Sequence, residues 1–187
     1  MRRLAHCSAQ PLVTMKRAAI IAGIIVVALT GMIWWGQQAA PPLPVDARVD
    51  LVVVKKGART LELYRGADQI RAYRVSLGRD PHGPKQREGD GRTPEGRYTL
   101  DYRKANSSFH RSLHISYPSP SDAAAARGKE LAPGGLIMVH GIRNGLGFVG
   151  RLHTLVDWTD GCIAVTDREI EEIWRVVPDG TPIVIEP

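Results

Sequence analysis

The chain has 187 residues, a length that fits one ordinary domain with a short additional segment. Its formal net charge is +6, but four of its 25 basic residues precede residue 18, so residues 41–187 carry 21 basic and 19 acidic side chains. A balance so close to neutral excludes the basic surface of a nucleic-acid-binding protein, and no nucleic-acid partner is expected.

A membrane-spanning helix is predicted over residues 18–35 (AAIIAGIIVVALTGMIWW), which carry no charge and are long enough to cross a bilayer. Residues 1–17 form a basic leader without an acidic residue, and the positive-inside rule keeps such a leader in the cytoplasm. We therefore expect a single-pass inner-membrane protein whose remaining residues lie in the periplasm, with Met15 as an alternative start. A cleaved signal peptide is an alternative, although residues 38–40 (QAA) match a cleavage site poorly, and a buried core helix is another.

The sequence contains two cysteines, Cys7 and Cys162, and the apolar segment lies between them. The exported part therefore has a single thiol and cannot form an internal disulfide. A lone thiol in an oxidising compartment is a liability unless it has a chemical use, so Cys162 is the first candidate for a reactive group. A buried, inert cysteine is the plainer interpretation.

A Pro- and Ala-rich spacer is predicted at residues 36–48 (GQQAAPPLPVDAR), before one domain at residues 49–187. The domain begins with an antiparallel meander, because short runs of alternating or β-branched residues are separated by Gly-containing turns. The expected strands of this meander are residues 51–54, 61–64 and 73–77. A long surface loop, dense in Gly, Pro and charge, is predicted at residues 78–96.

The second half of the domain is predicted to contain more strands and one clear helix. The expected strands are residues 98–102, 113–117, 136–139 and 181–186. One or two helical turns are expected in residues 121–130. Thr166 and Glu169 have the spacing of a capping box, and the apolar residues after them recur on one face of a helix. The predicted fold is mainly β, with one or two short helices.

The residues that carry chemistry gather between positions 136 and 166. Gly161 precedes Cys162, and a glycine beside a nucleophile leaves room for an acyl carbon and exposes backbone N–H groups to an oxyanion. A thiol needs a nearby base, and His140, at the end of a predicted buried strand, is well placed for that role. A zinc site of His140, His153 and Cys162 is conceivable. No tight ligand pair such as CxxC or HxxxH supports it, and no metal is expected.

These residues also form a recognisable pattern. The chain resembles the L,D-transpeptidase catalytic-domain family in His140-Gly141 and in residues 159–163 (TDGCI), which match the family's His-Gly and Ser/Thr-x-Gly-Cys motifs. Residues 77–78 (LG) and 91–96 (GRTPEG) also look like the family. The resemblance covers residues 49–186.

The resemblance implies a β-sandwich or barrel in which Cys162 attacks a peptide stem of peptidoglycan, releases the terminal D-alanine and forms a thioester. The acyl group would then pass to an amine of another stem, to a lipoprotein or to water. It further implies that His140 acts as base and then as acid. Gly161 and Cys162 would donate backbone N–H groups to the oxyanion, and Thr159 would support the histidine or the loop. It implies no metal or organic cofactor.

Three departures from the family pattern leave open whether the thioester is transferred to an amine or hydrolysed. Position 164 is Ala where Arg or Asn is frequent, and position 160 is Asp where His or Lys is frequent. The interval between His140 and Cys162 is long, as in a subgroup that includes enzymes hydrolysing lipoprotein–peptidoglycan links. A transpeptidase is the first hypothesis and a cysteine hydrolase of the same substrates is the second. From another class, a non-catalytic wall-binding module is the third.

Several further side chains are predicted to contact substrate. They are Gly141, His153, Arg143, Arg92, Asp160 and His114. Each has a plainer interpretation: the histidines as exposed groups, the arginines as solvated side chains and Asp160 as a turn residue. Arg143 and Arg151 are the candidates to replace the Arg that is absent at position 164. Asp157 is expected to form a turn, and Trp158 to pack against the fold beside the cysteine loop.

Overall fold

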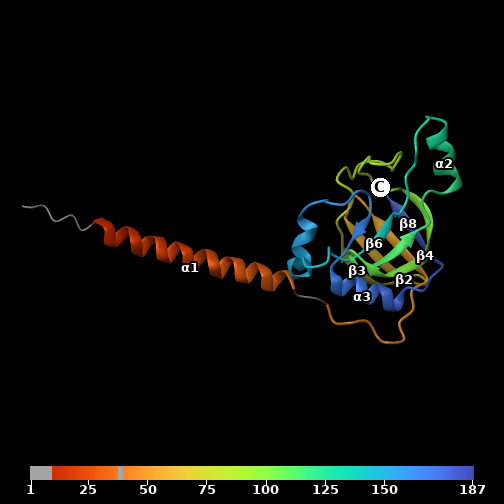
Figure 1. Ribbon diagram of the computed structural model, residues 1–187. Helices are drawn as coiled ribbons and strands as arrows, with labels where there is room; N and C mark the ends of the chain where they lie inside the picture. Colours follow the sequence, from red (N-terminus) through yellow and green to blue (C-terminus); the bar gives the residue numbers. More distant parts are fainter. Residues whose placement is uncertain (1–9, 38–39) are drawn as a thin grey trace, which may run out of the picture. The chain divides into compact units, whose positions relative to one another are not determined.

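The computed structural model describes residues 10–37 and 40–187, with the side chains of residues 10–16 left out. The chain consists of two units, Met1–Gln38 and Ala39–Pro187. The first contains helix α1 (Gln10–Gly36), and the second contains all the strands (Figure 1). Cys7 and most of the predicted basic leader lie outside the described residues.

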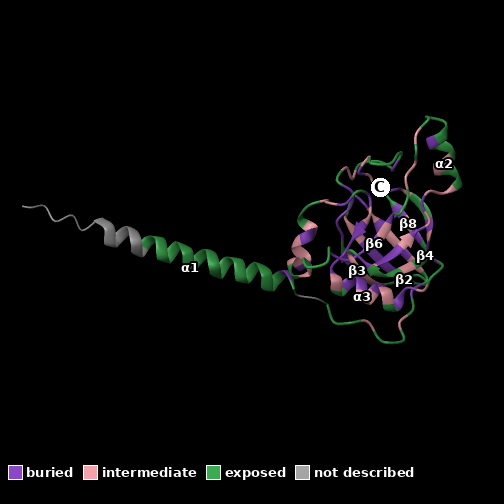
Figure 2. Ribbon diagram, in the orientation of Figure 1, coloured by how far each residue is buried: buried purple, intermediate pink, exposed green. Residues whose placement is uncertain are grey.

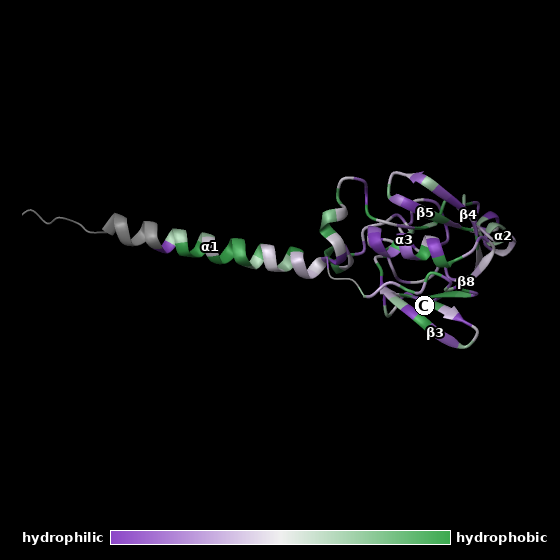
Figure 3. Cartoon of the chain, turned by 90° about the horizontal axis from the view of Figure 1, so that it is seen from below, coloured by the Kyte–Doolittle hydropathy of each residue, from purple (hydrophilic) through white to green (hydrophobic). Residues whose placement is uncertain are grey.

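Helix α1 includes the predicted apolar segment. Its residues 17–35 are exposed (Figure 2), and an 18-residue window within residues 17–36 has a mean hydropathy of 2.2. In Figure 3 this part of α1 is coloured mostly as hydrophobic. By length and composition it is able to cross a membrane as one helix.

One curled, eight-stranded sheet forms the second unit. The strands are β1 (Leu51–Lys55), β2 (Thr60–Arg65), β3 (Asp68–Arg74), β4 (Gly96–Ser107), β5 (His110–Ile115), β6 (Met138–His140), β7 (Ile163–Ala164) and β8 (Thr181–Glu186). Their order is β3-β2-β1-β8-β4-β5-β6-β7. The pairs β1–β8 and β6–β7 are parallel, and the others are antiparallel.

The sheet curls until its two ends approach each other. Ser76, just after β3, exchanges two backbone hydrogen bonds with Ala164 of β7, at 3.0 and 2.9 Å. Gly78 pairs with Thr159 in the same region. The predicted mainly β fold and the opening antiparallel meander are confirmed, although the third strand of the meander lies at Asp68–Arg74 and not at the predicted residues 73–77. The parallel pairs join segments far apart in the chain, and local patterns did not predict them.

In the predicted strand at residues 98–102, Tyr98, Leu100 and Tyr102 alternate with polar residues, and this pattern predicts that all three lie on the buried face. Tyr102 is exposed, whereas Tyr98 and Leu100 are buried. The β4–β5 register shifts between Leu100 and Arg103, and such an irregularity turns the following side chains to the other face.

Helix α3 (Asp167–Val176) packs against β6, the strand that carries His140. The predicted capping box is present: Thr166 Oγ1 accepts from the Glu169 N–H at 3.2 Å, and Glu169 accepts from the Thr166 N–H at 2.9 Å. Ile170 and Ile173 are almost fully buried, and α3 packs against β5 and β6. Helix α2 (Pro120–Arg127) and the 3₁₀ segment η1 (Gly147–Leu155) lie outside the sheet (Figure 1).

Part of the predicted spacer lies against this domain. The Leu43 N–H donates to Glu172 of α3 at 2.6 Å, and the guanidinium of Arg175 donates to the carbonyl oxygens of Leu43 and Pro44. Arg71 of β3 donates to the carbonyl oxygen of Pro41 at 2.7 Å. Residues 41–44 are therefore held on the surface beside α3.

Candidate active site

The parallel pairing of β6 with β7 brings the predicted nucleophile and base together. His140 faces Ala164 in the register, and Val139 faces Ile163. Cys162 lies one residue before β7 and so comes beside Met138. Because side chains alternate along a strand, Cys162 lies on the same face as Ala164 and His140. Both the thiol and the imidazole line one pocket.

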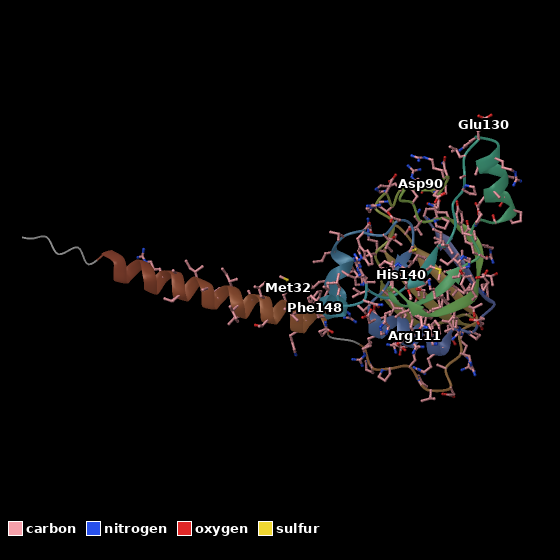
Figure 4. All side chains as sticks on the ribbon, in the orientation of Figure 1. Met32, Asp90, Arg111, Glu130, His140 and Phe148 are labelled. Atoms are coloured by element: carbon pink, nitrogen blue, oxygen red, sulfur yellow. The ribbon has the colours of Figure 1, made fainter. Side chains whose placement is uncertain are left out.

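This pocket has a volume of about 810 Å³ and is mainly apolar. Its apolar wall comes from the β4–β5 turn, from β6 and the residues on either side of it, and from η1 and the segment after η1. It comprises Phe109, Leu136, Met138, Ile142, Leu146, Val149, Leu152, Val156 and Trp158. Its polar lining includes Lys104, Ser107, Ser112 and Arg143. Figure 4 shows His140 within the sheet region of the domain.

His140 is buried and its orientation is defined by one hydrogen bond and two rings. Its Nδ1 lies 2.6 Å from the carbonyl oxygen of Gly141, which can only accept, so Nδ1 carries the proton and Nε2 is the free base. Phe109 and Trp158 pack against the imidazole with ring centroids 4.6 and 5.7 Å away. Burial lowers the pKa of His140, and the Gly141 carbonyl opposes this only in part. The ring is therefore neutral at pH 7 and able to accept a proton.

Cys162 is partly exposed, and its thiol contacts the carbonyl oxygen of Leu136 at 3.7 Å. Burial raises the pKa of the Cys162 thiol, with a smaller opposing effect from the Met138 backbone N–H. The resting site thus holds a neutral thiol and a neutral imidazole. For this thiol to act as a nucleophile, its proton would have to pass to a base.

Thr159 supports the loop that presents the thiol. Its hydroxyl donates to the carbonyl oxygen of Cys162 at 2.7 Å and accepts from the Gly161 N–H at 3.2 Å. The Gly161 N–H, expected from the resemblance to face the oxyanion, is therefore occupied. The Cys162 N–H donates to no group among the described residues and is the free backbone donor at this turn.

Glycine is required at position 161. The residue has φ +121°, and a Cβ there would lie 2.5 Å from the carbonyl oxygen of Arg92. Arg92 belongs to the predicted surface loop at residues 78–96, which packs directly on the cysteine loop. The close packing of the Arg92 backbone on Gly161 thus helps to fix the position of Cys162.

Two buried ion pairs fix this loop. Lys56 donates to the carbonyl oxygens of Gly83 and Thr93 and pairs with Glu95 at 2.7 Å. Asp90 (labelled in Figure 4) pairs with Lys85 at 2.9 Å and also accepts from three backbone N–H groups, those of Gln86, Arg87 and Arg92. Burial alone would raise the pKa of Asp90, but these hydrogen bonds outweigh it and lower the pKa to about 2.

The other predicted contact residues are spread over the surface. Arg143 lines the pocket and is exposed, and Asp160 lies at the rim in an ion pair with Arg79. Arg92 pairs with Asp80 at 2.9 Å and does not line the pocket. His114 also lies off the pocket wall: it pairs with Asp101 at 2.7 Å and is stacked on by Tyr102.

Gly141 and Asp157 have mainly structural contacts, and Arg151 lies outside the pocket wall. A Cβ at Gly141 would lie 2.8 Å from Asp167 Oδ1, so a side chain at this position would collide with Asp167. Asp157 binds the Arg59 guanidinium through two hydrogen bonds and accepts from the Leu77 N–H. Arg151 approaches Glu169 at 3.9 Å. His153 lines the pocket but is buried, whereas an exposed loop histidine was the favoured expectation.

Sequence reasoning missed Lys104, Phe109 and Ser112 as pocket residues. In the register, Lys104 faces Ser112 across β4–β5, and Ser112 faces His140 across β5–β6. Lys104 is therefore two strands from His140, about 10 Å away. Only the strand order reveals this row, because the residues are far apart in the chain.

A curled, mainly antiparallel sheet that presents the thiol of Cys162 and the imidazole of His140 to a common pocket defines a cysteine–histidine domain. The chain belongs to the L,D-transpeptidase catalytic-domain family (YkuD), whose sequence profile matches residues 49–185. It is 30% identical over 132 residues to YafK of Escherichia coli (strain K12), an L,D-transpeptidase by name, covering 67% of this chain and 46% of that one. The chain thus spans about half the length of the curated relative.

Two solved structures share the fold. The helical cell shape determining protein Pgp2 from Campylobacter jejuni matches with a TM-score of 0.58 and 23% identity, over 75% of this chain and 48% of that one. Bd1075 from Bdellovibrio bacteriovorus matches with a TM-score of 0.52 and 24% identity, over 74% of this chain and 48% of that one. At these identities the likeness concerns the fold of residues 49–187.

Proposed function

We propose that the domain is an L,D-transpeptidase that attacks peptidoglycan peptide stems with Cys162 and uses His140 as its base. The observation that supports this proposal is the β6–β7 register, which brings Cys162 and His140 to one face of the sheet, where both residues line one pocket. The family supplies the substrate class, and the apolar segment at residues 17–36 supports a domain held at the inner membrane and exposed to the periplasm.

The reaction begins with a bond from Cys162 Sγ to the carbonyl carbon at the L-centre of the stem's diamino acid, while the thiol proton moves to His140 Nε2. The Cys162 N–H donates to the oxyanion. When the intermediate collapses, the C–N bond breaks and His140 returns its proton to the amine of the departing D-alanine. An acceptor amine then attacks the thioester, gives its proton to His140, and releases the thiolate, which takes the proton back.

The charge of the pocket supports an anionic substrate. Lys104 and Arg143 are exposed in the pocket lining, and neither side chain has an ion-pair partner among the described residues. The carboxylate of Asp160 is paired with Arg79. Peptidoglycan stems carry free carboxylates, and the two cations provide the positive charge that Ala164 lacks. We propose that they bind those carboxylates.

The test is the intact mass of the detergent-solubilised chain after incubation with tetrapeptide stems, with and without an acceptor amine. The proposal predicts an acyl adduct on Cys162 formed with loss of D-alanine and resolved to cross-linked product when acceptor is present. Cys162→Ala should give no adduct, and His140→Ala should slow adduct formation greatly. An adduct that resolves only to shortened stems would identify a hydrolase. Absence of any adduct in the wild type would reject both enzymes in favour of a wall-binding module.

A further inference from the structure

His153 is a second imidazole in the pocket wall, and the reaction described above gives it no role. It comes from η1, is 6% exposed, and lines the pocket together with His140 and Trp158. A buried histidine that adjoins a catalytic pocket needs a physical explanation, because burial disfavours polar atoms unless they are satisfied.

Ser76 ties His153 to the strand that follows the nucleophile. The Ser76 hydroxyl donates to the carbonyl oxygen of His153 at 2.8 Å and lies 3.2 Å from its Nδ1. The backbone of Ser76 exchanges two hydrogen bonds with Ala164, two residues after Cys162. Ser76 thus links His153 to β7, the strand that begins directly after Cys162.

Trp158 makes the informative contact with His153. The indole Nε1–H donates to His153 Nδ1 at 3.4 Å, and an indole nitrogen can only donate. In this hydrogen bond Nδ1 accepts, which places the proton of the neutral ring on Nε2. The Ser76 hydroxyl, whose proton goes to the His153 carbonyl, is then a close neighbour of Nδ1 and not its hydrogen-bond partner. That Nε2 is buried and has no hydrogen-bond partner among the described residues. The unpaired Nε2–H costs about 1–3 kcal/mol. Because Nε2 has no partner, the polar contact that orients the ring is the hydrogen bond at Nδ1.

The same tryptophan contacts the base. The ring of Trp158 lies edge-on to His140, 5.7 Å away, and also packs against Phe109 at 5.9 Å. The one polar contact recorded for the His140 side chain is with the Gly141 carbonyl, and no carboxylate orients it within the described part of the chain. The direction in which Nε2 points therefore depends on the neighbouring rings.

We propose that His153 is a positioning residue: by accepting the Trp158 N–H it fixes the indole, and the indole fixes the ring of His140 toward Cys162. This inference rests on the proposed role of His140 as base. The bond requires a neutral His153, because a protonated Nδ1 would face the indole N–H as a second donor. Burial lowers the pKa of His153 to about 4, so the neutral ring is present throughout the neutral range.

The experiment measures the alkylation rate of Cys162 by iodoacetamide against pH, in the full chain with Cys7→Ser. No peptidoglycan is needed, so the outcome does not depend on the substrate. His153→Leu removes the acceptor, and Trp158→Phe removes only the donor and part of the ring. We expect both to shift the inflection of the pH profile and to lower the rate at pH 7 by about 10-fold. His153→Asn, whose Oδ1 takes the place of Nδ1, should restore most of the rate.

The double variant decides whether the two residues act through their shared bond. If they do, His153→Leu with Trp158→Phe should be little worse than either single change. The inference is overturned if His153→Leu lowers only the melting temperature and leaves the pH profile unchanged, or if the two effects multiply. His140→Ala separates this from the proposed function: if its profile equals that of the wild type, the base assignment itself fails and the inference fails with it.

Discussion

The hydroxyl of Thr159 donates to the carbonyl oxygen of Cys162 at 2.7 Å and closes the turn that presents the thiol. The hydroxyl oxygen of Thr159 also accepts a hydrogen bond from the buried Gly161 N–H. Thr159→Val keeps the shape but leaves both backbone groups unpaired. We expect a loss of about 2 kcal/mol in the free energy of unfolding and slower acylation of Cys162. Denaturant titration and adduct formation measure the two effects. Thr159→Ser retains the hydroxyl and should stay close to the wild type; equal losses in both variants would contradict this account.

Gly161→Ala should be far more damaging than alanine at a glycine in open space. The new Cβ would lie 2.5 Å from the Arg92 carbonyl oxygen, at a φ of +121°. Gly66 also has positive φ, but nothing lies within 4 Å of a Cβ there. We expect Gly66→Ala to cost about 1 kcal/mol in unfolding free energy, and Gly161→Ala to cost more and to abolish Cys162 acylation. Similar melting temperatures and activities for the two variants would show that the loop contact is unimportant.

Asp90→Asn tests whether the loop at residues 78–96 controls the nucleophile. The change leaves the Lys85 ammonium buried without its partner and should destabilise the fold by about 3 kcal/mol. Because Arg92 touches Gly161, Cys162 alkylation should also slow. Asp80→Asn removes the half-exposed partner of Arg92 in the same loop and is expected to change the stability little, because solvent screens an exposed ion pair. Limited proteolysis of the loop and alkylation kinetics compare the two; an unaltered alkylation rate in Asp90→Asn would disprove the coupling.

The stability of the domain should fall as the pH is lowered from about 6.5 to 4. His153 has a lowered pKa of about 4, so in this window the unfolded chain binds a proton that the folded chain does not. The stabilisation is complete above the unfolded value and is lost as the pH falls through the folded one, a total of about 3 kcal/mol. Urea unfolding at several pH values measures the slope. His153→Asn should flatten it and leave the contribution of buried His140, whose pKa is also lowered; an unchanged slope would exclude His153 as its source.

Lys104→Met and Arg143→Met test the binding of carboxylates. Each removes an unpaired cation from the pocket lining and leaves Cys162 and His140 untouched. We expect each change to raise the KM for tetrapeptide stems by about 10-fold, with little change in iodoacetamide reactivity and a weaker salt dependence. Lys129→Met, outside the pocket, serves as the control. Stems with amidated carboxylates should bind the wild type as weakly as normal stems bind the variants.

Local patterns in the sequence were enough for the apolar helix, the β1–β3 meander and α3. Each of these depends on contacts between residues near one another in the chain, such as the Thr166–Glu169 capping box, and so leaves a readable period or cap. Cys162 and His140 were also evident, because a glycine-flanked thiol and a histidine at a strand end lie in short motifs. Their chemistry depends on residue type, which the sequence states directly.

Only the tertiary structure decided how these residues meet. The pairing of β6 with β7 is parallel and joins segments more than 20 residues apart, and β7 has two residues, too few to show a period. The burial of His153, the pocket position of Lys104 and the outward turn of Tyr102 depend on strand order and on a shift in register. The sequence by itself therefore predicted Cys162 and His140 as the candidate reactive groups, and long-range pairing determined which other side chains surround them.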